Sequence, residues 1–273
     1  MNFAGKTALI TGASRGIGRA IALELAQQGV QRLILVARNA QRLQEVATDL
    51  QPFDVKVIPL ILDLTQSTDV TIAMAQTWRD HGPIHILVNC AGVAHQSWFP
   101  HSRPQDIHEE LMVNLMGLYS ITRLISRRMI SQQEGLIVNV SSLMGRLAAP
   151  TMATYSATKF AIVGFTEALR NELRPYGIRV VALLPSLTDT DMVQDMTWFR
   201  WVQPLTPIQV AQALIQGLNR GSREILVGWQ SHLAVWGYRL VPGLMQELLR
   251  WCAPSSRSAP PRRKPRRTWA ALR

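Results

Sequence analysis

Short, almost wholly apolar runs alternate with stretches of helical periodicity along most of this chain. Because strands that are apolar throughout and separated by helices are typical of a parallel sheet covered on both faces, the pattern predicts an α/β fold with a doubly wound, seven-stranded parallel sheet. The predicted strands are Lys6–Ile10, Leu33–Ala37, Val55–Leu60, Ile84–Val88, Leu136–Val140, Arg179–Leu184 and Glu224–Val227. The predicted helices include Ala20–Gln28, Ala40–Leu50, Thr68–Asp80, Pro104–Met129 and Thr154–Arg174.

The domain organisation follows from where these elements end. Residues 1–228 contain every predicted strand and are expected to form one domain, a size that a single domain commonly has. Residues 229–254 are rich in Trp and Leu, and Pro242-Gly243 divides them, which predicts an amphipathic helical extension in two pieces. Residues 255–273 are rich in Ser, Pro and Arg, a composition that predicts a disordered basic tail.

The net charge of +11 belongs mostly to this tail. Seven basic side chains and no acidic one follow Trp251, and without them the chain would carry only +4. Together with the aromatic extension, the basic run suggests contact with an anionic membrane surface; a subunit contact or a cap over the substrate pocket are the alternatives. No nucleic-acid partner is expected, because a basic run alone is weak evidence for one.

The cysteine and histidine positions bear on the cellular compartment and on metal binding. Cys90 and Cys252 are the only cysteines and suggest no disulfide framework, as in a reducing compartment. We see no signal peptide before the first strand and no run of about 20 apolar residues, which predicts a cytoplasmic protein; any membrane association would come from the C-terminal residues. His95, His101 and His108 lack the spacing of metal ligands, so no metal site is predicted.

A glycine-rich segment, Thr11-Gly12-Ala13-Ser14-Arg15-Gly16-Ile17-Gly18, joins the first predicted strand to a helix. Glycines permit a tight turn and a close approach to a pyrophosphate, while the helix N-terminus offers free N–H groups. A turn without a ligand is the alternative, but the order of strand, loop and helix favours a Rossmann-type dinucleotide site.

The end of the second strand indicates which dinucleotide is bound. An NAD site places a carboxylate there for the ribose 2′-hydroxyl, whereas this chain has Arg38-Asn39. Arg38 and Arg15 are suited to hold a 2′-phosphate by charge-assisted hydrogen bonds; the alternative is that Arg38 is a solvated surface residue. Because the carboxylate is missing, we predict NADP, with NAD the less favoured cofactor.

Three residues near the fifth strand predict proton chemistry. Ser142 follows this strand, and Tyr155 and Lys159 share one face of the next helix because they are four residues apart. An adjacent ammonium group is expected to lower the phenol pKa from about 10 toward the working range of an acid/base. Each residue alone has an ordinary structural explanation, so the prediction depends on the three occurring together.

With these motifs the chain resembles the short-chain dehydrogenase/reductase family from about Lys6 to Gly228. The resemblance rests on the Thr11–Gly18 loop, Asn89-Cys90-Ala91-Gly92, Asp63-Leu64, Asn114 and the step of thirteen residues from Ser142 to Tyr155. It implies a catalytic tetrad of Asn114, Ser142, Tyr155 and Lys159, in which Lys159 also binds the nicotinamide ribose and Asn114 holds a water. It further implies that Pro185, Thr188 and Thr190 hold the carboxamide, and that the protein is a homo-oligomer.

The motifs and the resemblance together define the predicted cofactor contacts. Two positions depart from the family pattern: Cys90 stands where Asn is usual, and Ser186 replaces a glycine and is expected to need an unusual backbone angle. The predicted contacts are Gly12, Ser14, Arg15, Gly16, Ile17, Gly18, Arg38, Asp63, Leu64, Asn89, Ala91, Gly92, Tyr155, Lys159, Pro185, Thr188 and Thr190.

The segment Asp191–Pro204 is rich in Met and aromatic residues, and the family resemblance implies a mobile lid there. Its apolar residues suit a lipophilic substrate, although packing within the protein explains them equally well. They are Met192, Met196, Trp198, Phe199 and Trp201. We therefore predict an oxidoreductase that moves a hydride between NADP(H) and a carbonyl or alcohol carbon; a 3-oxoacyl thioester reductase, a catalytically silent NADP-binding regulator and a membrane-recruited scaffold are the alternatives.

Overall fold

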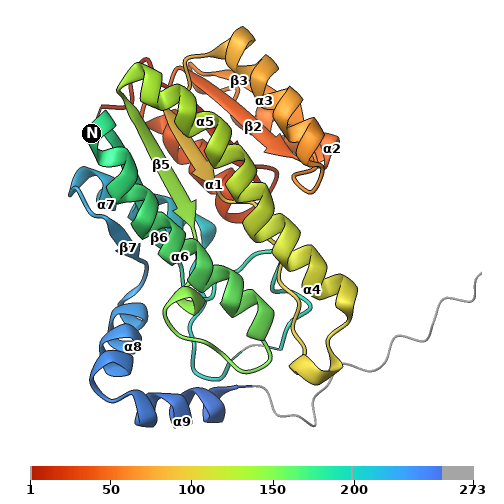
Figure 1. The fold of residues 1–273 in the computed structure, drawn as a ribbon, viewed down its shortest axis with the longest axis vertical. Helices are drawn as coiled ribbons and strands as arrows, with labels where there is room; N and C mark the ends of the chain where they lie inside the picture. Colours follow the sequence, from red (N-terminus) through yellow and green to blue (C-terminus); the bar gives the residue numbers. More distant parts are fainter. Residues whose placement is uncertain (1, 198, 254–273) are drawn as a thin grey trace, which may run out of the picture.

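The computed structural model describes residues 2–197 and 199–253, and within them the chain forms the predicted seven-stranded parallel sheet. The strand order is β3-β2-β1-β4-β5-β6-β7, so the chain winds outward in both directions from the centre of the sheet (Figure 1). The predicted tail, residues 255–273, lies outside the described residues. The strands are β1 (Thr7–Thr11), β2 (Arg32–Ala37), β3 (Lys56–Ile61), β4 (Ile86–Asn89), β5 (Gly135–Val140), β6 (Ile178–Leu184) and β7 (Glu224–Leu226).

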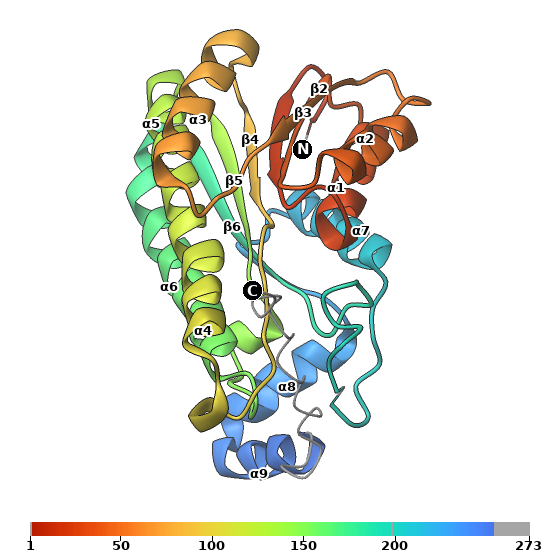
Figure 2. The same ribbon diagram turned by 90° about the vertical axis from the view of Figure 1, so that its right-hand side faces the viewer.

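Helices cover both faces of the sheet (Figure 2). The side chains of α1, α2 and α7 join one apolar core, and those of α3, α5 and α6 join a second core on the opposite face. The helices are α1 (Gly16–Gln27), α2 (Ala40–Asp49), α3 (Ser67–His81), α4 (Pro104–Leu111), α5 (Leu118–Gln132), α6 (Ala153–Leu173), α7 (Pro207–Asn219), α8 (Trp229–Leu240) and α9 (Pro242–Cys252).

Strand β2 shows why the apolar runs form this sheet. Leu33 and Leu35 pack into one core, while Ile34 and Val36 point to the other, because side chains alternate along a strand. Both sets are buried, so the sequence reads as continuously apolar rather than alternating. Apolar runs of this kind mark all seven strands, and the predicted strand boundaries agree with the observed ones to within two residues.

Two helical features differ from the sequence prediction. The predicted helix Pro104–Met129 is interrupted by a π-helical turn, Met112–Gly117, between α4 and α5. Helix α7 was not among the predicted helices, although Thr206 and Gln209 form a capping box at its start. The capping box, together with Pro207 at the first helical position, was the signal in the sequence that could have predicted the start of α7.

The C-terminal extension forms two helices, α8 and α9, which meet at Pro242 as predicted. Both lie at the end of the molecule toward which the carboxyl ends of the strands point (Figures 1 and 2). Among the described helices, none combines the length and the hydropathy needed to span a bilayer.

A buried ladder of amides and hydroxyls joins the central strands to the helices on one face. Asn89 at the end of β4 donates to Thr122 and to Asn139, both at 2.8 Å. Asn139 of β5 donates in turn to Thr166 of α6 at 2.9 Å. Because buried amides need partners, these bonds fix β4, β5, α5 and α6 relative to one another.

We expect Asn139→Ala to lower the free energy of unfolding by about 2–3 kcal/mol, because it leaves buried partners unsatisfied. Urea unfolding followed by circular dichroism measures the change. Ser131→Ala, which removes an exposed hydroxyl of α5, is the control and should change stability by less than about 0.5 kcal/mol. Equal stability of the two variants would contradict a structural role for the ladder.

Candidate active site

Two adjoining cavities lie at the carboxyl ends of the strands. The first, here called the loop cavity, is lined by the glycine-rich segment, the ends of β2 and β4, and residues of α6. The second, here called the apolar cavity, is lined mainly by the residues after β5 and β6. Tyr155 and Thr190 line both cavities, so the two spaces meet at these side chains.

The glycine-rich segment passes very close to the chain that follows β4. Gly12 has φ +67°, and a Cβ there would lie 2.7 Å from the Cα of Ala91. Thr11 secures this approach, since its hydroxyl oxygen accepts hydrogen bonds from the amides of Cys90 (3.0 Å) and Ala91 (3.1 Å). A side chain at Gly18 would likewise collide with the carbonyl of Gly12. Only glycine therefore fits at these two positions.

Helix α1 begins at Gly16 on the wall of the loop cavity, and no side chain caps its N-terminus. Its first N–H groups and its dipole favour an anion there. The predicted contacts Ser14, Arg15, Gly16 and Ile17 all line this cavity, as do Gly12 and Gly18. The segment thus fits a dinucleotide pyrophosphate, both in its lack of side-chain bulk and in its charge.

Three arginines gather at the end of the loop cavity beside β2. Arg15 and Arg38, which the sequence predicted, line it together with Arg42, which the sequence analysis missed. The side chain of Asn39 caps α2 by accepting from the amide of Arg42, which places Arg42 in the first turn next to the strand end. An N-cap residue after a predicted strand was the signal that would have revealed it.

A single carboxylate holds two of these arginines. Asp191 accepts from Arg42 at 2.7 Å and from Arg15 at 3.1 Å, while Arg38 lies 3.8 Å from Glu109. Hydrogen bonds from Arg42 and Arg15 lower the pKa of Asp191, so this side chain is ionised at neutral pH. Asp191 belongs to the segment after β6, and it links that segment to the glycine loop and α2.

The remaining predicted contacts of the loop cavity are mostly in place. Asp63, Leu64, Ala91 and Gly92 line its middle part. Asn89 lines neither cavity, because its side chain is directed into the buried ladder between β4 and β5.

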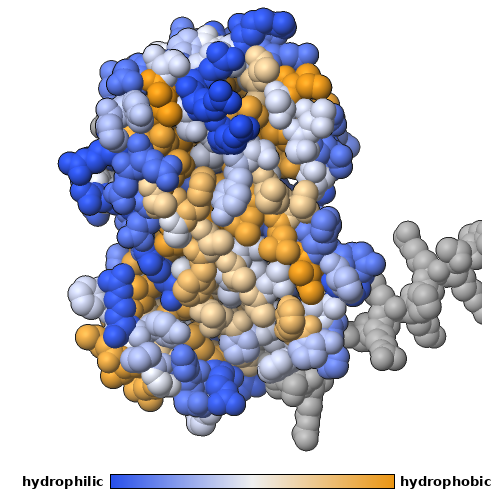
Figure 3. Space-filling view, in the orientation of Figure 1, coloured by the Kyte–Doolittle hydropathy of each residue, from blue (hydrophilic) through white to orange (hydrophobic). Residues whose placement is uncertain are grey.

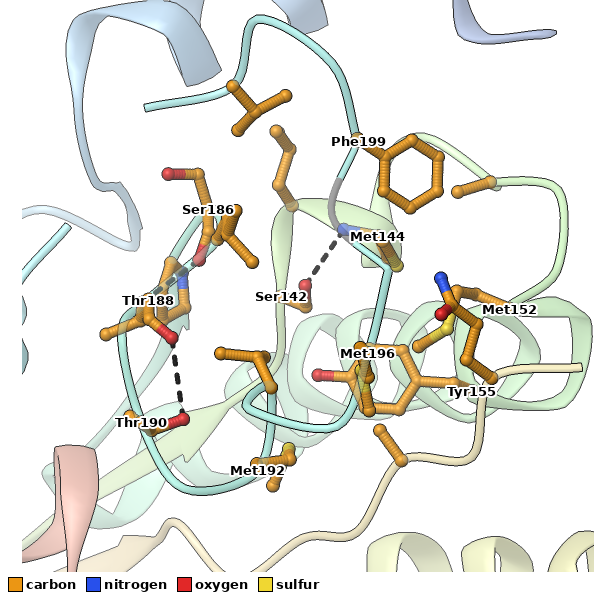
Figure 4. A pocket seen from close by; sticks show the side chains of 18 of the residues that line it. Ser142, Met144, Met152, Tyr155, Ser186, Thr188, Thr190, Met192, Met196 and Phe199 are labelled. Carbon is orange, nitrogen blue, oxygen red and sulfur yellow. Dashed lines mark hydrogen bonds between the residues drawn. The ribbon is translucent and has the colours of Figure 1, made fainter. Parts of the chain in front are cut away.

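Ser142, Tyr155 and Lys159 converge where the two cavities meet. Ser142 directly follows β5 and lines the apolar cavity, and its hydroxyl oxygen accepts from the amide of Met144 at 3.1 Å. Figure 4 shows Ser142 and the Tyr155 hydroxyl on the wall of this cavity. Lys159 lies one turn further along α6, with its Nζ 5.4 Å from the centre of the Tyr155 ring.

The expectation that Lys159 lowers the pKa of Tyr155 is wrong for this structure. Burial raises the pKa of Tyr155 to about 12, against a smaller lowering by its hydrogen bond with Ser142. Burial also lowers the pKa of Lys159 to about 8, and its Nζ donates to the carbonyl of Val140 at 3.1 Å. Tyr155 is therefore a phenol at neutral pH, ready to donate a proton, while Lys159 is mostly charged.

Asn114 lies in the π-helical turn and is fully buried. Its amide donates to the carbonyl of Val93 (3.0 Å) and to Thr158 (3.1 Å), and its oxygen accepts from the amide of Val93 (2.8 Å). The side chain thus joins the loop after β4 to α6 and lines neither cavity. π-Helical turns are frequent at functional sites, where they redirect a side chain.

Apolar side chains line most of the second cavity. Pro185 and Thr188 line it beside Ser142, as does Leu249 of α9, which sequence reasoning did not identify as a pocket residue. Of the predicted lid residues, Trp201 is exposed to solvent and Trp198 lies outside the described residues. The cavity wall also carries Met192, Met196 and Phe199 from the lid segment, and Leu143, Met144, Leu147 and Met152 from the loop after β5. Figure 4 labels the four methionines and Phe199 around the cavity.

Neither departure from the family pattern disturbs the site. The non-glycine residues with positive φ in the described ranges are Gln133, Thr151 and Trp201, so the unusual backbone angle expected at Ser186 is wrong. Burial raises the pKa of the Cys90 thiol to about 12, which keeps it neutral and unreactive. Across residues 2–197 and 199–253, no group of His, Cys, Asp and Glu side chains is arranged to hold a metal ion.

Comparison with known proteins agrees with this geometry. Residues 6–200 match the family model described as short chain dehydrogenase. A 3-oxoacyl-[acyl-carrier-protein] reductase from Aquifex aeolicus is 36% identical over 189 residues, which cover 69% of this chain and 76% of that protein. The chain belongs to the short-chain dehydrogenase family, whose members are oxidoreductases.

Solved structures share the fold over nearly the whole chain. A short-chain dehydrogenase from Burkholderia cenocepacia in complex with NADP has a TM-score of 0.80 and 27% identity, covering 93% of this chain and all of that one. A member from Burkholderia phymatum in complex with NAD has a TM-score of 0.79 and 26% identity, covering 93% and 99%. Because similar structures hold either dinucleotide, the choice between them depends on the residues of this chain.

Proposed function

We propose that this protein reduces the carbonyl group of a lipophilic substrate, or oxidises the corresponding alcohol, with NADP(H) as the hydride carrier. One observation supports this most directly: Tyr155 borders both the cavity suited to a dinucleotide and the apolar cavity, with Ser142 beside it. A substrate carbonyl in the apolar cavity would meet both hydroxyls at the junction with the loop cavity. Residues 1–228 supply every group in this proposed mechanism.

The three arginines at the end of the loop cavity beside β2 favour NADP over NAD. Arg15, Arg38 and Arg42 place three cations at the end of β2, and the strand end itself carries no acidic residue. Guanidinium groups bind phosphate with paired hydrogen bonds, whereas a ribose 2′-hydroxyl offers them no charge. The nearby carboxylates of Asp191 and Glu109 are already paired with these arginines.

In the reducing direction, bound NADPH would supply a hydride to the carbonyl carbon. Ser142 and Tyr155 donate hydrogen bonds that hold and polarise the carbonyl oxygen. As the C–H bond forms, the Tyr155 O–H bond breaks and its proton passes to that oxygen, which gives the alcohol and a phenolate. The charge of Lys159 stabilises this phenolate until it regains a proton from solvent, and Asn114 fixes the loop after β4 against α6.

The apolar cavity supports a lipophilic substrate, because its wall carries Met, Leu and Phe side chains. The Aquifex relative favours a second candidate, reduction of a 3-oxoacyl thioester. A panel of aromatic ketones, long-chain ketones and 3-oxoacyl thioesters, assayed by NADPH oxidation, separates the two. A protein that binds NADPH and turns over none of them would be a regulator rather than an enzyme.

We further propose a homo-oligomer formed through the outer surfaces of α4 to α6. Leu111, Met116 and Phe160 expose apolar surface there, which supports a subunit contact on that side.

Tyr155→Phe removes the proposed proton donor while keeping the ring. We expect NADPH affinity to change little and turnover to fall by at least about a hundredfold, the usual contribution of a positioned acid. NADPH fluorescence measures binding, and NADPH oxidation measures turnover. The control is Tyr176→Phe, at an exposed tyrosine beyond α6, which should retain activity. Substantial activity in Tyr155→Phe would refute the mechanism.

Arg42→Gln and Arg38→Gln test the choice of cofactor. Each should raise the Kd for NADPH about tenfold, because each removes a charged partner of the 2′-phosphate, and should change the Kd for NADH little. Arg19→Gln is the matched control, since Arg19 lies on α1, pairs with Asp49 and does not line either cavity. An equal loss of NADPH and NADH affinity would contradict the assignment.

The pH dependence of reduction should follow Lys159. Tyr155, with a pKa of about 12, stays protonated across the usual range, whereas Lys159 loses its charge as the pH rises through about 8. We therefore expect kcat/KM for NADPH to be level at neutral pH and to fall by up to about tenfold per pH unit above that value. A profile that stays level to high pH would show that the charge of Lys159 is not required.

A further inference from the structure

Helices α8 and α9 expose an unusual amount of apolar surface, here called the C-terminal face. Its members are 45% to 75% exposed, and three of them are tryptophans. In the space-filling view, apolar side chains gather at the lower left, over the region of α8 and its junction with α9 (Figure 3). The C-terminal face consists of Trp229, Leu233, Trp236, Leu240, Val241, Leu244, Leu248 and Trp251.

The exposed side chains form one stripe on each helix. On α8 they recur at intervals of four, three and four residues, which places them on one side of the helix. Ser231 and Val235, on the opposite side of α8, are buried against the domain. On α9 the spacing from Leu244 to Leu248 to Trp251 repeats this pattern, while Leu249 is turned into the apolar cavity. Each helix therefore has an inner side that packs against the domain or lines the apolar cavity, and an outer side whose apolar side chains are largely exposed to solvent.

The charges around this face are almost all positive. Helix α8 contains Arg239 and no acidic residue, and Glu247 of α9 is paired with Arg250 at 2.9 Å. The sequence then continues directly from α9 into Arg257, Arg262, Arg263, Lys264, Arg266, Arg267 and Arg273 without an acidic residue. A second copy of the chain would add a second set of positive charges without acidic partners in this part of the sequence, and like charges repel.

We propose that the C-terminal face binds the surface of an anionic lipid bilayer. The tryptophan and leucine side chains would enter the interface between headgroups and acyl chains, where indole rings are favoured, and the basic segment would contact the anionic headgroups. Neither α8 nor α9 can cross a bilayer, so the association is peripheral. This inference does not depend on the proposed reaction.

The position of the face also relates the membrane to the apolar cavity. Leu249 lines that cavity from the inner side of α9, while Leu248 lies on the outer side of the same turn. Binding through the C-terminal face would hold the apolar cavity one helix away from the lipid. A lipophilic compound that partitions into the bilayer would thereby be concentrated near the cavity.

The test is flotation of the full chain with vesicles of phosphatidylcholine, with and without phosphatidylserine. We expect at least about tenfold tighter binding when phosphatidylserine is present. In the full chain, Leu233→Asp with Trp236→Asp should weaken this binding at least about tenfold, since both changes place a carboxylate on the inserted stripe. Replacing the five basic residues from Arg262 to Arg267 with glutamine should remove most of the preference for phosphatidylserine.

The controls separate lipid binding from unfolding and from self-association. Ile72→Asp and Ile208→Asp change isoleucines that are 52% and 60% exposed on α3 and α7, and they should bind vesicles like the unchanged protein. Circular dichroism and the urea midpoint should be the same for all variants. Binding that ignores phosphatidylserine, or that survives the Leu233 and Trp236 changes, overturns the proposal. Self-association that these two changes abolish, without any vesicle binding, also overturns it and identifies the face as a contact between copies.

Discussion

The close passage of two backbones at the centre of the sheet determines where everything else in the site lies. Gly12 after β1 and Ala91 after β4 approach so closely that no side chain fits between them, and the hydroxyl of Thr11 ties the two segments together. Because β1 and β4 are neighbours from which the chain winds outward in opposite directions, this point is where an open sheet leaves a crevice. The loop cavity, the N-terminus of α1 and the ends of β5 and α6 are all positioned around it.

The chemistry at the end of β5 depends on burial as much as on proximity. Tyr155 and Lys159 share a face of α6, but the low polarity of their surroundings disfavours the charged form of each. The tyrosine thus holds its proton more firmly and the lysine less firmly than either would in water. An arrangement of this kind is better suited to giving a proton to an oxygen than to removing one at neutral pH.

Most of the fold and the core of the candidate site were accessible from the sequence, for identifiable reasons. Buried parallel strands produce apolar runs, and glycines near a strand end are needed where backbones meet, so the sheet and the Thr11–Gly18 loop could be recognised. Arg42 was missed although the Asn39 N-cap was a local signal for it, whereas the role of Asp191 depends on segments that the fold brings together over long sequence separation. The pKa of Tyr155 was misjudged because spacing along a helix reveals a neighbour but not the depth of burial. The π-helical turn at Asn114 leaves no trace in the apolar pattern.

Asp191 shares its carboxylate between Arg15 and Arg42, and this pairing affects how strongly a phosphate can bind in the corner that these arginines form beside β2. A phosphate arriving there does not neutralise bare cations; it substitutes for an anion that the protein already provides. The net gain is the difference between two similar sets of contacts, so discrimination by this corner is an exchange equilibrium. Mobile ions screen both sides of that exchange, which makes it less sensitive to ionic strength than the capture of a phosphate by unpaired arginines would be.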